Sequence, residues 1–249
     1  MQSAPAARSV VGIDASRAIG RIKTGTEAYA HHLIRRLAPS LLRRHEVRLY
    51  FRTHPEPVAD ADLLAALGSA DRRVMPLPRL WTHVRLSWEM ARHPPDLLFV
   101  PSHVLPLIRP RRTLVTIHDL GYRRFPKAHP ASQRLYLELS THWNARVATH
   151  ILADSTATRD DIIRAYGISP EKITVIYPGY EQGLAPVRAP EALDAIRARY
   201  AIPGPYILFI GRIQPRKNLL RLIEAFNGVL PDHPDIHLVL AGPTGWMSA

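Results

Sequence analysis

Short apolar runs alternate along the chain with stretches whose apolar residues recur at helical spacing. The runs predict strands at residues 10–14, 46–51, 74–77, 97–100, 113–117, 151–153 and 173–177. The stretches between them predict helices at residues 26–37, 59–67, 81–92, 130–148 and 156–166. Nearly continuous apolar strands joined by helices are typical of a parallel sheet covered on both faces. The pattern therefore predicts an α/β protein with a Rossmann-like parallel sheet.

The pattern changes character between residues 180 and 204, where prolines and a glycine surround one helix predicted at 191–200. A second β-α-β unit follows, with strands at 206–210 and 237–241 and a helix at 218–230. We predict an N-terminal domain at 1–185, a linker at 186–204 and a partial C-terminal domain at 205–249. Because two strands and one helix form a marginal unit alone, we expect the chain to be truncated within its second domain.

Composition narrows the classes of function. The chain has no cysteine, which excludes disulfides and cysteine-based zinc sites. The polar start predicts no signal peptide, and no apolar run is long enough for a membrane span, so we expect a cytoplasmic protein. The net charge is +12, but the arginines are scattered as pairs and match no nucleic-acid-binding pattern. Nucleic acid is therefore not an expected partner.

Two stretches, residues 33–44 and 79–92, mix apolar or aromatic residues with arginines. Such helices can lie on an anionic membrane surface, which would place the protein peripherally at the inner membrane face. An apolar stripe that faces the core while arginines face water gives the same pattern. The sequence leaves both interpretations open.

The segment 206–218 ends an apolar run at Gly211 and continues through Arg212 and Lys217 to Asn218, where a helix is predicted to begin. A strand that delivers cations to a helix N-terminus is suited to holding an anion such as a phosphate. Arginine is a forked donor and lysine a compact charge, and together they can neutralise a diphosphate. The alternative is an exposed loop in an arginine-rich protein.

A second turn, after the first predicted strand, carries Gly20, Gly25 and Thr26 before a helix. Its backbone amides can receive a phosphate or a sugar hydroxyl, or the glycines can serve a tight turn with Thr26 as the helix cap. The spacing matches neither the dinucleotide-binding G-x-G-x-x-G nor the P-loop, so the NAD and ATP fingerprints are absent.

His118 and Asp119 follow a predicted strand, at the position where open parallel sheets bind ligands. A histidine there can exchange a proton or bond a sugar hydroxyl, and a solvated loop histidine is the alternative. No further residues stand at metal-ligand spacing, so no metal is expected.

Four stretches occur in a fixed order. They are Gly-Ile-Asp-Ala-Ser-Arg at 12–17 with Thr-Gly-Thr-Glu at 24–27, Thr-Ile-His-Asp-Leu at 116–120, Ile-Tyr-Pro-Gly at 176–179, and Phe-Ile-Gly-Arg-Ile-Gln-Pro-Arg-Lys-Asn at 209–218. Together they resemble the retaining glycosyltransferases of family 4, which have the GT-B architecture. The resemblance spans nearly the whole chain, and the last motif is the most specific.

The resemblance implies that the N-terminal domain binds an acceptor and the C-terminal domain binds a nucleotide-sugar. The implied reaction moves a hexose of mannose or glucose type to a glycan or lipid-linked acceptor with retention, as in polysaccharide biosynthesis, without a metal or other cofactor. The implied catalytic residues are His118, Arg212 and Lys217. The implied donor-binding residues are Gly25, Thr26, Gly211, Arg212, Lys217 and Asn218, and the implied acceptor-binding residues are Arg17 and Asp119.

The sequence also departs from the family, because the E-x₇-E segment that holds the nucleotide ribose is not found before residue 249. We therefore expect this chain alone to show little or no transfer. Two other functions stay open: a non-catalytic module that binds the acceptor or a membrane surface, and a nucleotide-binding enzyme of another class, such as a dehydrogenase or an epimerase.

Overall fold

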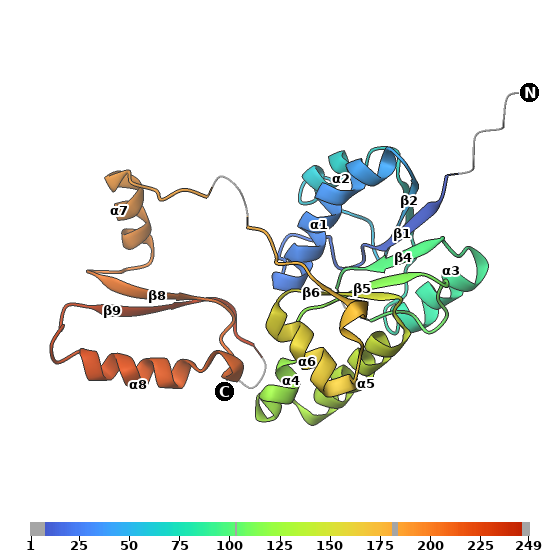
Figure 1. Ribbon diagram of the computed structural model, residues 1–249. Coiled ribbons are helices and arrows are strands. Elements are labelled where there is room, and N and C mark those ends of the chain that lie inside the picture. Colours follow the sequence, from blue (N-terminus) through green and yellow to red (C-terminus); the bar gives the residue numbers. More distant parts are fainter. Residues whose placement is uncertain (1–7, 103, 181–183, 246–249) are drawn as a thin grey trace, which may run out of the picture. The chain divides into compact units, whose positions relative to one another are not determined.

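A computed structural model describes residues 8–102, 104–180 and 184–245 (Figure 1). The chain divides into two compact units, residues 1–120 with 135–178 and residues 121–134 with 179–249. The domain boundaries expected from the sequence stay a prediction, and each unit is described by itself.

The first unit contains a seven-stranded sheet in the order β3-β2-β1-β4-β5-β6-β7, with every neighbouring pair parallel. Its strands are β1 Val10–Asp14, β2 Glu46–Phe51, β3 Asp71–Val74, β4 Leu97–Val100, β5 Thr113–Ile117, β6 His150–Ala153 and β7 Ile173–Val175. The predicted α/β class with a parallel sheet is confirmed.

Helices cover both faces of this sheet (Figure 1). Their bounds are α1 Gly25–Leu42, α2 Ala61–Leu67, the π-helical turn η1 Thr82–Leu86, α3 Ser87–Arg92, α5 Ala131–Val147, α6 Thr156–Tyr166 and the 3₁₀ turn η3 Pro170–Lys172. Figure 1 shows α1 and α2 on one face and α3, α5 and α6 on the other. This division follows from right-handed crossovers, because the strand order runs one way from β1 to β3 and the other way from β4 to β7.

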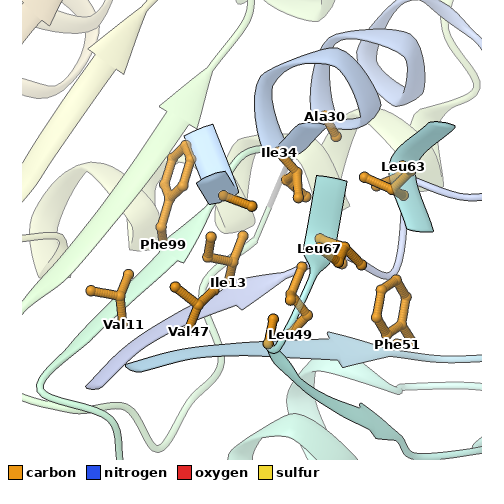
Figure 2. Packing of buried hydrophobic residues seen from close by; sticks show 14 residues of the cluster. Val11, Ile13, Ala30, Ile34, Val47, Leu49, Phe51, Leu63, Leu67 and Phe99 are labelled. Atoms are coloured by element: carbon orange, nitrogen blue, oxygen red, sulfur yellow. The ribbon is translucent and has the colours of Figure 1, made fainter. Parts of the chain in front are cut away.

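The core lies between α1, α2 and the sheet (Figure 2). Ala30, Ile34 and Ala38 stand four residues apart on α1 and are fully buried. Leu37 and Leu41 pack against the same cluster. The apolar side of the 33–44 stretch therefore faces the core, so this stretch offers a membrane no apolar face.

Helix α1 extends five residues beyond the predicted end at 37 and contains Pro39 in its last turns. Proline has no amide hydrogen, so the carbonyl of Arg35 loses its helical partner. Leu41 and Leu42 nevertheless pack against the core cluster, and this burial holds the end of the helix.

Strand β3 was expected at 74–77 but lies at Asp71–Val74. It is an edge strand with no alternation of buried residues, so its apolar pattern is weak. Its register pairs Arg48 with Asp71, and the Arg48 guanidinium donates from Nε to Asp71 Oδ2 at 3.2 Å. Cross-strand charge pairing thus accompanies a strand that hydrophobicity did not indicate.

The second unit contains the predicted β-α-β unit. Its elements are α4 Gly121–Arg124, the 3₁₀ turn η2 Pro126–Ala128, α7 Pro190–Arg199, β8 Tyr206–Ile210, the 3₁₀ turn η4 Pro215–Lys217, α8 Leu219–Val229 and β9 His237–Ala241. Strands β8 and β9 pair in parallel over their full length. Ile207, Leu208 and Ile210 stay 43%, 46% and 75% exposed. This small sheet therefore leaves much of its apolar surface uncovered within the described residues.

We predict that Ile34→Ala destabilises the first unit by about 2–5 kcal/mol, because it removes buried methyl groups from a packed cluster and leaves a cavity. Urea unfolding followed by circular dichroism measures the change. The matched control is Ile22→Ala, at a side chain that is 91% exposed, where the free energy of unfolding should change by less than about 0.5 kcal/mol. Equal effects at the two positions would contradict the packing described here.

Candidate functional site

His118 connects the carboxyl ends of three neighbouring strands. It follows β5, and its Nδ1 lies 2.6 Å from Oδ2 of Asp154, which follows β6. Its Nε2 lies 3.1 Å from the carbonyl oxygen of Pro101, which follows β4. A carbonyl oxygen only accepts hydrogen bonds, so Nε2 donates to Pro101 in the protonation states that carry a hydrogen on Nε2. A sugar hydroxyl can reach Nε2 only if the bond to Pro101 opens.

Further contacts fix the position of His118. Its backbone carbonyl accepts a hydrogen bond from Thr158 Oγ1 at 2.9 Å, and Thr158 lies in the first turn of α6. The Tyr29 ring of α1 meets the imidazole edge-on, with ring centroids 4.9 Å apart. The Tyr29 hydroxyl lies 3.4 Å from Thr116 Oγ1, and burial raises the pKa of this phenol above its ordinary value. The Tyr29 side chain is therefore an uncharged neighbour of the imidazole.

Asp14 ends β1 and is almost fully buried. Its Oδ1 accepts a hydrogen bond from the Ser16 amide at 2.9 Å. Burial raises the pKa of the Asp14 carboxyl above its ordinary value, against the opposing effects of Ser16 and the charge of Arg17. A desolvated carboxyl thus stands where the glycine-containing loop begins.

Asp60 holds the loop between β1 and α1. Its carboxylate is fully buried and accepts hydrogen bonds from the backbone amides of Gly20 at 3.1 Å and Glu56 at 3.0 Å. Lys23 Nζ lies 3.4 Å from Asp60 Oδ1 and donates to the Gly20 carbonyl at 2.6 Å. Gly20 has φ +114°, a conformation that side chains disfavour, so this turn requires glycine.

A hollow of about 500 Å³ beside this loop is lined by Arg21, Glu56, Val58 and Ala59.

The alternative in which Thr26 caps the helix is wrong, because Thr24 is the N-cap of α1. The Thr24 amide donates to Glu27 Oε2 at 2.8 Å, which is the reciprocal bond of a capping box and requires a three-residue spacing. Gly25 and Thr26 therefore form the first helical turn. Arg17 Nη1 lies 3.8 Å from Glu27 Oε1, so Arg17 also stands at this helix N-terminus.

In the second unit, Gly211, Arg212, Lys217 and Asn218 lie between β8 and α8, as the sequence predicts. Arg212 Nη1 donates to the Thr244 carbonyl at 3.4 Å. Lys217 ends η4, and Asn218 adopts a left-handed conformation with φ 55°, which asparagine tolerates, at the start of α8. Within the described part of the chain, neither Arg212 nor Lys217 forms an ion pair with a carboxylate.

The predicted site residues thus fall into two groups. His118, Asp119, Arg17, Gly25 and Thr26 follow strands of the first unit, and Gly211, Arg212, Lys217 and Asn218 follow β8 of the second. Sequence reasoning did not single out Asp14, Tyr29, Asp60, Asp154 or the buried Gln214. The position of Asp154 directly after an apolar run was the available signal for that residue.

Across the described residues, no group of three or more His, Cys, Asp or Glu side chains is arranged to hold a metal ion. In the same part of the chain, no helix combines the length and apolar character needed to cross a membrane.

A seven-stranded parallel sheet covered by helices, followed by a parallel β-α-β unit, is the arrangement expected of a GT-B-like fold. The family model described as Glycosyltransferase Family 4 matches residues 23–182, and the model described as Glycosyl transferases group 1 matches residues 194–247. The chain belongs to glycosyltransferase family 4.

Two curated relatives illustrate the similarity. O-antigen chain mannosyltransferase B of Escherichia coli is 28% identical over 164 residues, which cover 65% of this chain and 42% of the relative. D-inositol 3-phosphate glycosyltransferase of Kineococcus radiotolerans is 28% identical over 148 residues, which cover 57% of this chain and 33% of the relative. The match thus spans less than half the length of either relative.

Solved structures share the fold. Anabaena Alr3699/HepE, in complex with UDP and glucose, has a TM-score of 0.63 at 17% identity, covering 96% of this chain and 62% of that structure. WaaG, a glycosyltransferase involved in lipopolysaccharide biosynthesis, has a TM-score of 0.59 at 16% identity, covering 95% of this chain and 64% of that structure. At these identities the likeness supports the GT-B-like fold alone.

We predict that Asp60→Asn loosens the glycine-containing loop and destabilises the first unit by about 1–3 kcal/mol, because the amide keeps one acceptor oxygen and turns an NH₂ group toward buried donors. Hydrogen exchange of the Gly20 and Glu56 amides should become faster. Asp232→Asn is the matched control, at an exposed position. Unchanged protection of both amides would show that Asp60 does not hold the loop.

We predict that Asp14→Asn changes how stability depends on pH. The folded pKa of Asp14 is raised above 3.8 by burial, so the folded state keeps a proton that the unfolded state has lost. The stability of the wild-type protein should therefore fall, relative to the variant, as pH rises from about 3.8 through the folded pKa. Urea unfolding of both proteins over this range measures the difference. A difference independent of pH would contradict the assignment.

Proposed function

We propose that this chain contributes the acceptor-binding domain and the diphosphate-binding loop of a retaining hexosyltransferase. The enzyme would move a mannose- or glucose-type hexose from a nucleotide-sugar to a glycan or lipid-linked acceptor. The family membership and the mannosyltransferase among its relatives support this reaction. The complex of Alr3699/HepE with UDP and glucose supports a UDP-sugar as the donor class.

The observation that carries the proposal is the loop between β8 and α8. Arg212 and Lys217 stand there without carboxylate partners in the described part of the chain, at the carboxyl end of a parallel strand. Unpaired cations beside a helix N-terminus favour an anion with several oxygens. A diphosphate fits this requirement better than a neutral sugar hydroxyl does.

In the proposed reaction, the bond between the sugar C1 and the donor phosphate oxygen breaks, and a bond from C1 to the acceptor oxygen forms on the same face. The acceptor hydroxyl proton passes to an oxygen of the leaving diphosphate. Arg212 and Lys217 stabilise the negative charge that develops on this leaving group. Gly211 and Asn218 contribute backbone close to the phosphates, and Gly25 and Thr26 approach the donor from the first turn of α1.

On the first unit, His118 is proposed to lie near the transferred sugar. Asp154 is proposed as its positioning residue, because its carboxylate holds Nδ1 at 2.6 Å and thereby sets the ring orientation. Arg17 and Asp119 are proposed to contact the acceptor.

The proposed location is cytoplasmic, with a peripheral position at the inner membrane face. A non-catalytic acceptor- or membrane-binding module is the second candidate function. The observation in its favour is an exposed group of apolar side chains and arginines on the first unit, described below.

We predict that inorganic pyrophosphate binds the β8–α8 loop of this chain and shifts the amide resonances of Gly211 and Asn218. Arg212→Ala and Lys217→Ala should each weaken binding about 10-fold or more, since each removes a hydrogen bond to a charged group. Arg221→Ala removes an exposed charge from α8 and serves as the control. If the control weakens binding as much as the other two, the loop holds no specific anion site.

We predict that, in any form of the protein with measurable sugar transfer, Arg212→Ala and Lys217→Ala each lower the rate about 10²–10³-fold. Assays with UDP- and GDP-linked glucose and mannose measure the rates. Unchanged turnover in both variants would remove the roles assigned here.

A further inference from the structure

Five large apolar side chains of the first unit are exposed in two segments that also contain buried residues. They define the Trp88 surface, with exposed fractions in parentheses: Leu80 (67%), Val84 (53%), Trp88 (54%), Leu107 (54%) and Ile108 (52%). Val84 and Trp88 lie in the continuous η1–α3 segment, in which Leu86 and Met90 are buried. Leu80 precedes this segment, and Leu107 and Ile108 belong to the loop between β4 and β5.

Hydrogen bonds join the two segments that carry this surface. Ser87 Oγ in the first turn of α3 accepts from the amide of Leu107 at 3.0 Å and lies 3.4 Å from the amide of Ile108. Val84 and Trp88 are four residues apart on the continuous η1–α3 segment, which places them on one side of it. The exposed residues of both segments therefore belong to one neighbourhood.

Arginines accompany the exposed apolar residues. The Arg92 guanidinium carbon lies 4.3 Å from the centroid of the Trp88 ring, and that of Arg109 lies 5.0 Å from the Trp143 ring. The whole stretch 79–112 contains six arginines and two acidic residues. Of these two, Glu89 is buried and paired with Arg73 as well as with Arg85 and His93. Its charge is thus largely compensated within the fold.

We propose that the Trp88 surface docks peripherally on an anionic lipid bilayer. Tryptophan and leucine-type side chains enter the headgroup boundary, while arginines remain at the level of the phosphates. Net positive charge supplies the complementarity, because each basic residue near an anionic leaflet strengthens binding. The 33–44 stretch lacks this capacity, since its leucines pack on the core.

Vesicle flotation of the 249-residue chain tests this inference. Vesicles of phosphatidylcholine alone are compared with vesicles that also contain phosphatidylglycerol, at low and high salt. The wild-type chain should float with the anionic vesicles only, and added salt should weaken binding. Trp88→Ser with Ile108→Ser should lower the partition coefficient on the order of 10-fold, and Arg111→Gln with Arg112→Gln should lower it about 10- to 30-fold.

Matched controls separate a defined surface from diffuse attraction. Arg43→Gln with Arg44→Gln removes the same charge from exposed positions after α1, and Val58→Ser removes a 91% exposed apolar side chain elsewhere. Both controls should bind anionic vesicles like the wild type. Circular dichroism verifies folding, and the Arg111 and Arg112 variant decides alone if the Trp88 variant does not fold, because both arginines are exposed.

Three results would overturn the assignment. The first is no flotation of the wild-type chain with anionic vesicles. The second is an equal loss in the controls, which would indicate charge without a specific surface. The third is a dimer that dissociates in the Trp88 variant while vesicle binding is unchanged, which would make a second copy of the chain the occupant. None of these measurements involves Arg212 or Lys217, so their outcome is independent of the proposed donor loop.

Discussion

The parallel pairing of β4, β5 and β6 is the constraint on which the candidate site of the first unit depends. Their ladders align Val100 with Val115 and Ile117 with Ala153, so the three strands end at one edge. Only this register brings Pro101 and Asp154 to the two nitrogens of His118. A slip of one residue would turn alternate side chains to the other face and separate these groups. The arrangement of the polar groups around His118 therefore depends on the register of the sheet.

Two buried carboxyl groups, those of Asp14 and Asp60, lie near this edge, and they differ in how many hydrogen-bond donors surround them. Asp60 receives backbone amides from Gly20 and Glu56 as well as the Lys23 ammonium, so its charge is compensated within the fold. For Asp14, desolvation outweighs the hydrogen bonds from Ser16, and the pKa rises. Asp60 thus fixes the shape of the glycine-containing loop before any ligand arrives, because its partners are all provided by the chain itself.

The sequence predicted elements that have a strong local pattern, and it did not predict features that depend on pairing between distant residues. Strands such as β1 and β4 were predicted to the residue, because continuous apolar runs ended by polar residues or proline are a strong local signal. Strand β3 was predicted at the wrong residues, because it is stabilised by pairing with its partner strand rather than by an apolar pattern of its own. The Asp154–His118 contact joins residues 36 positions apart, so only the tertiary structure reveals it. The position of His118 at a strand end was predictable because it follows a local apolar run. Its two partners were not predictable, because they lie far away in the sequence.

In the second unit, the β8–α8 loop is held by backbone pairing rather than by its charged side chains. The Ile213 amide donates to the Pro243 carbonyl at 2.9 Å, and the Gly245 amide donates to the Ile213 carbonyl at 2.7 Å. These bonds continue the β8–β9 ladder past the last paired strand residues. Arg212 adds one hydrogen bond at 3.4 Å, and Lys217 forms no side-chain hydrogen bond within the described residues. Replacing either cation should therefore leave the loop folded, because the bonds that shape it belong to the main chain. Their charges are thus available to a ligand, and a loss of anion binding in such variants reports on recognition rather than on folding.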